Sequence, residues 1–116
     1  MRLRNKKAAA EKRREDLERE LERIRAILSS RDDIEKAISF GSFARGIAGG
    51  TSDLDLIIVQ RTTRRFMDRL DEIYQLIVPR IACDILVYTP EEFERLKTES
   101  RFVASAIERG ATIHAA

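Results

Sequence analysis

The segment Leu54–Val59 constrains the fold most, because all of its side chains except Asp55 are aliphatic. A strand of this composition is typical of a sheet that is covered on both faces, usually by helices. Asp53 and Asp55 stand at the head of this strand, and because side chains alternate along a strand they project from the same face. Carboxylates this close repel each other, and burial adds to the cost. A divalent cation relieves that repulsion, so the segment predicts a covered sheet with a cation site at one end.

Length and composition limit the classes of protein to which the chain can belong. Its 116 residues suffice for one small domain with a modest core, and we expect a single domain over residues 1–116. The net charge of +2 gives no strong signal for nucleic-acid binding. No apolar run is long enough to span a membrane, and the basic N-terminus lacks the apolar segment of a signal peptide. A single cysteine, Cys83, excludes an internal disulfide, and a cytoplasmic setting is expected.

The other elements follow from periodicity and from start and stop signals. A long helix is expected within residues 1–30, because residues 4–28 contain no Gly or Pro. Its buried stripe comprises Leu17, Leu21, Ile24 and Leu28, whereas its basic first half is expected to be solvated, frayed or bound to a partner. Thr89–Glu92 is a capping box that opens a helix to Leu96. The remaining elements are strands at Ile34–Phe40, Ile81–Tyr88 and, at a sheet edge, Ala111–His114, and helices at Arg65–Ile77 and Ser100–Arg109.

This order of elements predicts the fold class. It is α/β (α+β), with a small mixed sheet of three to four strands flanked by helices and a long N-terminal helix. The helix over Arg65–Ile77 is expected to turn one apolar face to the core, made of Phe66, Met67, Leu70, Ile73, Tyr74 and Ile77.

Two further features bear on the predicted cation site. Asp84 is the single charged residue in the third strand, and if that strand lies beside the second, Asp84 completes a cluster of three carboxylates. The first strand ends at Gly41-Ser42, ten residues before Asp53. If the first two strands are antiparallel neighbours, Gly41 and Ser42 reach the same sheet edge, where Gly41 lets the backbone approach a ligand and Ser42 starts a short turn suited to phosphate oxygens.

This pattern, Gly41-Ser42, then Asp53-Leu54-Asp55, then a lone Asp84 in an apolar strand, resembles the nucleotidyltransferase superfamily of DNA polymerase beta. Within it the chain is most similar to the minimal nucleotidyltransferases of bacteria and archaea. The resemblance implies transfer of a nucleoside monophosphate, usually from ATP, to a hydroxyl with release of pyrophosphate. It implies that Asp53, Asp55 and Asp84 are the catalytic ligands of two Mg²⁺ ions and that Gly41 and Ser42 hold the distal phosphates. Arg45 is a further candidate for phosphate binding.

The acceptor is not evident from the residues. Some members of the family are antitoxins that adenylylate a HEPN-type partner protein, and the resemblance implies this role. We expect the chain to lack the additional C-terminal domain with which larger relatives bind their acceptor, so that the acceptor is recognised by a partner's surface, by a second subunit or not at all. The alternative function is a catalytically silent subunit of the same fold that binds nucleotide or a partner. A glycosyltransferase with its own Asp-x-Asp motif is disfavoured, because Gly41-Ser42 would be unexplained.

Overall fold

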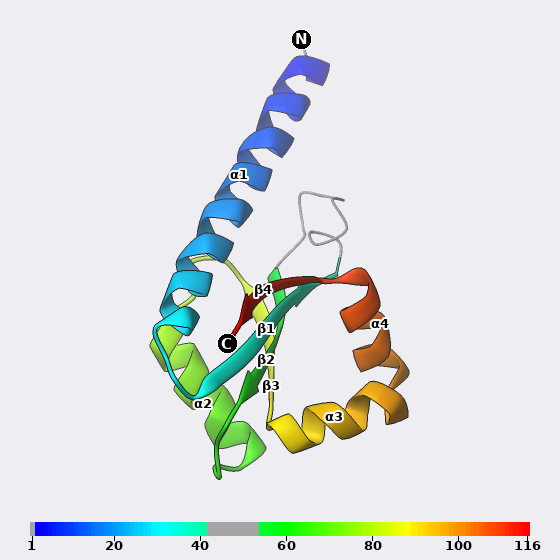
Figure 1. Cartoon of the computed structure of the whole chain (residues 1–116). Coiled ribbons are helices and arrows are strands. Elements are labelled where there is room, and N and C mark those ends of the chain that lie inside the picture. Colours follow the sequence, from blue (N-terminus) through cyan, green and yellow to red (C-terminus); the bar gives the residue numbers. More distant parts are fainter. Residues whose placement is uncertain (1, 42–53) are drawn as a thin grey trace.

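A computed structural model gives the fold, and it describes residues 2–41 and 54–116. The elements in these residues are α1 (Arg2–Ser29), β1 (Ile34–Phe40), β2 (Leu54–Gln60), α2 (Phe66–Ile77), β3 (Cys83–Tyr88), α3 (Pro90–Glu99), α4 (Arg101–Arg109) and β4 (Ala111–Ala115). They confirm the predicted fold class, including the long N-terminal helix (Figure 1).

The four strands form one mixed sheet in the order β3-β2-β1-β4. Strand β2 pairs with β1 in antiparallel fashion and with β3 in parallel fashion, so both neighbours on which the predicted site depends are present. Strand β4 pairs antiparallel to β1 and forms the second edge of the sheet, as predicted.

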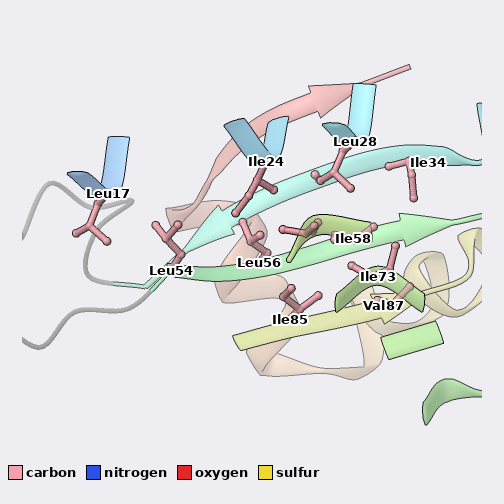
Figure 2. Close-up of a cluster of buried hydrophobic side chains, with 12 residues drawn as sticks. Leu17, Ile24, Leu28, Ile34, Leu54, Leu56, Ile58, Ile73, Ile85 and Val87 are labelled. Atoms are coloured by element: carbon pink, nitrogen blue, oxygen red, sulfur yellow. The ribbon is translucent and has the colours of Figure 1, made fainter. Parts of the chain in front are cut away.

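Helices cover both faces of the sheet, α1 and α2 on one side and α3 and α4 on the other (Figure 1). The larger core lies under α1 and α2, where the side chains of Leu54, Leu56 and Ile58 point from β2 (Figure 2). The smaller core lies under α3 and α4 and takes the alternate residues of β2, Ile57 and Val59. Because β2 is aliphatic on both faces, it contributes to both cores.

Helix α1 differs along its length. Leu17, Ile24 and Leu28 are fully buried against the sheet and Leu21 is half-buried, so the predicted stripe is confirmed. Residues 6–12 are all exposed, and this part of the helix extends past the end of the sheet (Figure 1). Arg23 connects the docked half to α2, since its guanidinium donates to the carbonyls of Ile77 and Val78 at 2.9 and 3.1 Å.

The core face predicted for α2 was partly wrong. Ile73 and Ile77 are fully buried, but Met67 is 65% exposed, and Phe66 and Tyr74 are 37% and 36% exposed. The buried residues of α2 are Arg69, Ile73 and Ile77, at i, i+4 and i+8, and Met67 lies on the other side of the helix from this stripe. A second difference is that β3 begins at Cys83, since the register with β2 starts at the pair Leu54–Cys83 and leaves Ile81 outside the strand.

The predicted capping box at α3 is present in full. The Thr89 hydroxyl accepts from the Glu92 N–H, and the Glu92 carboxylate accepts from the Thr89 N–H. The same carboxylate accepts from Arg69 Nη1 at 2.7 Å. Burial alone would raise the pKa of Glu92, but the hydrogen bonds from Arg69 and from the Thr89 N–H outweigh it, and the pKa is lowered.

Side chains of α2 cover the outer edge of β3. Because the Ala82 carbonyl accepts from Leu54 N–H, alternation turns the carbonyls of Cys83 and Val87 away from β2. The Tyr74 hydroxyl donates to the Cys83 carbonyl at 2.6 Å, and Arg69 Nη1 approaches the Val87 carbonyl at 3.5 Å. Within residues 2–41 and 54–116, no helix has both the length and the apolar composition needed to cross a membrane.

Candidate active site

The end of β1 meets the beginning of β2 at one end of the sheet, which we call the carboxylate edge because Asp55 and Asp84 lie there. Phe40 is the register partner of Asp55, so Gly41 follows directly beside that aspartate. Gly41 has φ +86°, a conformation that residues with a side chain rarely adopt. A Cβ on Gly41 would lie 2.5 Å from Asp55 Oδ2, which is closer than atoms can pack. A glycine is therefore required here for the backbone to approach the Asp55 carboxylate.

Strand β3 brings a second carboxylate to the same place. Asp55 is the register partner of Asp84 in the parallel pair, so their Cα atoms lie about 4.8 Å apart on neighbouring strands. Both side chains belong to the sheet face covered by α3 and α4, because Ile57 and Leu86, two residues further along each strand, pack in that core. Strand β3 is an edge strand and Asp84 is exposed, whereas Asp55 is half-buried.

The charge of Asp84 has no cationic partner within the described part of the chain, where no hydrogen bond or ion pair involves its carboxylate. The phenol of Tyr74 has a raised pKa mainly because of burial, and the nearby Asp84 carboxylate adds to the rise. A carboxylate that is in register with a second carboxylate and lacks a protein cation is suited to bind a cation from solution.

The structure tests the predicted site only in part. Gly41, Asp55 and Asp84 are described and share one edge of the sheet. Ser42, Arg45 and Asp53 lie outside the described residues. Among the residues that are described, no group of three His, Cys, Asp or Glu side chains could hold a metal ion, so the three-carboxylate cluster stays a prediction. The oxygen ligands of Asp55 and Asp84 fit the preference of Mg²⁺, which commonly takes one or two carboxylates and completes its shell with water and phosphate oxygens.

A small cavity adjoins the carboxylate edge, and it was not predicted from the sequence. Its volume is about 180 Å³, and it lies between the end of β1 and helix α4. The lining residues are Phe40, Gly41, Phe102, Ser105, Ala106 and Arg109. The spacing of Phe102, Ser105 and Arg109, at i, i+3 and i+7, places them on one face of α4 and was the available signal. That face becomes part of the site only because α4 packs beside β1, which a local pattern does not reveal.

A larger cavity, of about 540 Å³, lies between α1 and the segment before β3. Its central carboxylate, Glu20, is 4% exposed and accepts two hydrogen bonds from Arg23 and one from the Arg80 N–H. The hydrogen bonds from Arg23 lower the pKa of Glu20. Because these charges are matched within the chain, they tie α1 to α2 and β3, and we do not assign them to the site.

The class of the protein follows from this geometry and from its similarity to a known family and to a solved structure. Residues 21–109, well over half of the chain, match the model of the nucleotidyltransferase domain family. The chain belongs to this family, within the DNA polymerase beta superfamily that the motif predicted.

A solved structure shows the same fold. It is the crystal structure of a "putative nucleotidyltransferase" from Sulfolobus solfataricus, which shares 27% sequence identity with this chain and has a TM-score of 0.59. The similarity covers 75% of this chain and 79% of the other. A search among curated proteins found no match. The family and the fold indicate transfer of a nucleotidyl group as the general reaction.

Proposed function

We propose that the chain is a Mg²⁺-dependent adenylyltransferase, which moves AMP from ATP to a hydroxyl acceptor and releases pyrophosphate. The acceptor we propose is a HEPN-type partner protein, with the chain acting as the antitoxin of that pair. The single observation that carries the proposal is the register of β1, β2 and β3, which places Gly41, Asp55 and Asp84 side by side.

The reaction proposed is an in-line displacement at the α-phosphorus of ATP. The acceptor oxygen forms a bond to this phosphorus while the bond to the β-phosphate oxygen breaks, and pyrophosphate leaves with the electron pair of the broken bond. The acceptor proton passes to the Asp84 carboxylate, which can return it to water because Asp84 is exposed. The Gly41 backbone leaves room for polyphosphate beside Asp55, since a side chain at that position would fill the space.

Asp55 and Asp84, together with Asp53, are the residues that would hold two Mg²⁺ ions. Such ions would supply positive charge to stabilise the attacking and leaving oxygens of the displacement. The protein's contribution is a fixed set of oxygen ligands on two hydrogen-bonded strands, because β2 and β3 cannot shift relative to each other without breaking the ladder.

The proposed acceptor is a protein for a physical reason. Asp84 is exposed at the start of β3, and neither of the cavities described above is lined by it. A hydroxyl on the surface of a folded partner can reach the carboxylate edge, whereas a small acceptor would need a pocket to hold it.

The test is transfer of label from ATP labelled at the α-phosphate. The parent chain is incubated with this ATP, Mg²⁺ and a purified HEPN-type protein, and both labelled protein and released pyrophosphate are measured. We expect Asp55→Asn and Asp84→Asn to reduce transfer by at least roughly 100-fold, the effect typical of losing one group that stabilises transition-state charge. Asp32→Asn is the matched control, because Asp32 is an exposed aspartate that precedes β1, at the opposite end of the sheet from Asp55 and Asp84.

The outcomes separate the proposal from its alternative. Equal transfer by the parent and Asp84→Asn would contradict the proposed role of that carboxylate. Mg²⁺-dependent binding of ATP by the parent without transfer to any hydroxyl would favour the catalytically silent subunit. Transfer to water or to a nucleotide hydroxyl, with none to protein, would keep the enzyme and reject the antitoxin role.

A further inference from the structure

The cavity beside Gly41 contains the feature that the proposed function does not use. Arg109 lines it at the last turn of α4, and Phe40, Phe102 and Ala106 supply apolar walls. No acidic residue is among the six that line it. We propose that Arg109 binds the distal phosphates of the nucleoside triphosphate and, after transfer, the pyrophosphate; this inference rests on the proposed function.

Arg109 lies at a fixed place beside β1. Helix α4 ends at Arg109, and β4 begins at Ala111, which is the register partner of Ser39 on β1. A Cβ on Gly110 would lie 2.6 Å from the Ser39 carbonyl and 2.4 Å from the Ala106 carbonyl, so the chain between α4 and β4 is held tightly against β1. The end of α4 is therefore fixed at the sheet edge where Gly41 approaches Asp55.

The guanidinium of Arg109 is available to bind an anion. Arg109 is exposed, and within the described residues its guanidinium makes no hydrogen bond or ion pair. Arg109 differs in this from most arginines of α1 with described side chains, which pair with a glutamate or aspartate of the same helix, as Arg14, Arg19, Arg23 and Arg25 do. An unpaired guanidinium beside a carboxylate edge can bind an anion that the carboxylates alone would repel.

The hydrogen-bond donors of Arg109 suit a phosphate ligand. A guanidinium presents parallel N–H donors that match two phosphate oxygens, so it is better suited to a phosphate group than an ammonium is. The Ser105 hydroxyl, one turn before Arg109 and lining the same cavity, is a second donor. With cations on the Asp55 and Asp84 side and Arg109 on the other, a polyphosphate lying along Gly41 would meet positive charge at both ends.

Phe102 shapes the cavity rather than binding phosphate. Its ring meets that of Phe40 edge to face, with centroids 5.4 Å apart, although 51% of the side chain is exposed. Phe40 is the register partner of Asp55, so this aromatic pair sets the distance between α4 and the carboxylate edge.

The test is equilibrium binding, which does not depend on finding the acceptor. Affinities for pyrophosphate and for AMP, each with Mg²⁺, are measured by calorimetry for the parent chain and for Arg109→Gln. We expect the affinity for pyrophosphate to fall roughly 10- to 100-fold, the loss typical of a hydrogen bond between charged groups. The affinity for AMP, which lacks the distal phosphates, should change less than about twofold. Arg109→Lys keeps the charge but not the planar fork and should lose an intermediate amount.

Arg101→Gln is the matched control, because Arg101 is an exposed arginine at the opposite end of the same helix. Equal losses in Arg101→Gln and Arg109→Gln would overturn the inference, since they would reflect net charge alone. It would also be overturned by unchanged pyrophosphate binding in Arg109→Gln, by a parent chain that binds no pyrophosphate, or by a loss for AMP as large as that for pyrophosphate. The last result would place the nucleoside in the cavity.

The same measurements distinguish this inference from the proposed function. If Asp55→Asn and Asp84→Asn leave transfer unchanged while Arg109→Gln weakens pyrophosphate binding, the proposed role of the carboxylates fails and the phosphate site stands. If Arg109→Gln behaves like the parent while Asp84→Asn abolishes transfer, the phosphate site fails and the proposed function stands.

Discussion

The carboxylates at the two ends of the sheet differ in their hydrogen-bond and ion-pair partners. At the end where β1 begins and β2 finishes, Asp33 accepts hydrogen bonds from Arg31 Nη2 at 2.8 Å and from Gln60 Nε2 at 2.9 Å. Gln60 also donates to Glu72, which lies 3.5 Å from Arg64. At the opposite end Asp55 and Asp84 are in register, and no cationic side chain of the described residues pairs with Asp84.

The difference shows which acidic groups serve stability. The hydrogen bond from the Arg31 side chain lowers the pKa of Asp33, which means that the folded protein stabilises its charged form. No such partner among the described residues stabilises Asp84, so its charge contributes little to folding. We infer that the first end of the sheet is built for stability and the second for a ligand.

The sharpest test of this comparison is the free energy of unfolding without metal. Asp33→Ala removes the hydrogen-bond acceptor of Arg31 and one of the two acceptors of Gln60, and we expect a loss of about 1–3 kcal/mol. Asp84→Ala should change the free energy by less than about 0.5 kcal/mol, as for an exposed residue without a partner. Urea denaturation measures both. A loss at Asp84 as large as that at Asp33 would mean that both ends are structural.

A ligand should reverse the comparison. A nonhydrolysable ATP analogue with Mg²⁺, at ten times its dissociation constant, should stabilise the parent by about 1.4 kcal/mol. Asp33→Asn should retain this gain, measured from its own lower baseline, whereas Asp84→Asn should lose most of it at the same analogue concentration. Thermal denaturation with and without the analogue gives these values. A full gain in Asp84→Asn would show that ligand binding does not use this carboxylate.

The backbone at the ligand end gives a smaller effect. Gly41→Ala places a methyl group against Asp55 Oδ2 and forces a residue with a side chain to φ +86°. We expect a cost of about 1 kcal/mol in stability from the backbone alone, together with weaker binding of the analogue. Chemical denaturation and calorimetry separate the two effects. If the Gly41→Ala variant matched the parent in both, the approach of Gly41 to Asp55 would have no importance.

The smallest expected effect is in the dependence on pH. Because the pKa of Asp33 is lower in the folded state, its contribution to stability is complete above its unfolded pKa of about 3.9 and is lost as the pH falls through the folded pKa. The stability difference between the parent and Asp33→Asn should therefore be constant near neutral pH and shrink below about pH 4. Urea titrations from about pH 7 to about pH 2.5 measure it. A stability difference that grew in acid would contradict a lowered pKa of Asp33 in the folded protein.

Much of the fold could be predicted from the sequence because local signals agreed with tertiary packing. The strand Ile34–Phe40 was predicted to the residue, and the capping box at Thr89 gave the start of α3. The aliphatic composition of β2 predicted a strand that is covered on both faces, whereas its pairing with β1 and β3, which brings Asp55 to Asp84, was only a condition of the predicted site.

The errors arose where a partner distant in sequence decided the outcome. Arg69 is 7% exposed because it pairs with Glu92, 23 residues away, and no local pattern marks an arginine for burial. With Arg69 in the buried stripe, Met67 faces solvent although it is apolar. Arg109 was missed for a related reason, since its place at the site depends on the packing of α4 against β1. The predicted roles of Ser42, Arg45 and Asp53 remain predictions.

The covering of the outer edge of β3 restricts how an acceptor can approach. With the Cys83 carbonyl occupied by Tyr74 and the Val87 carbonyl approached by Arg69, an incoming protein cannot extend the sheet as a fifth strand next to Asp84. It must instead offer its hydroxyl end-on, from a loop tip or a flexible tail that dips toward the strand termini. For the protein acceptor proposed above, the modified residue is accordingly expected to lie in a protruding, irregular segment.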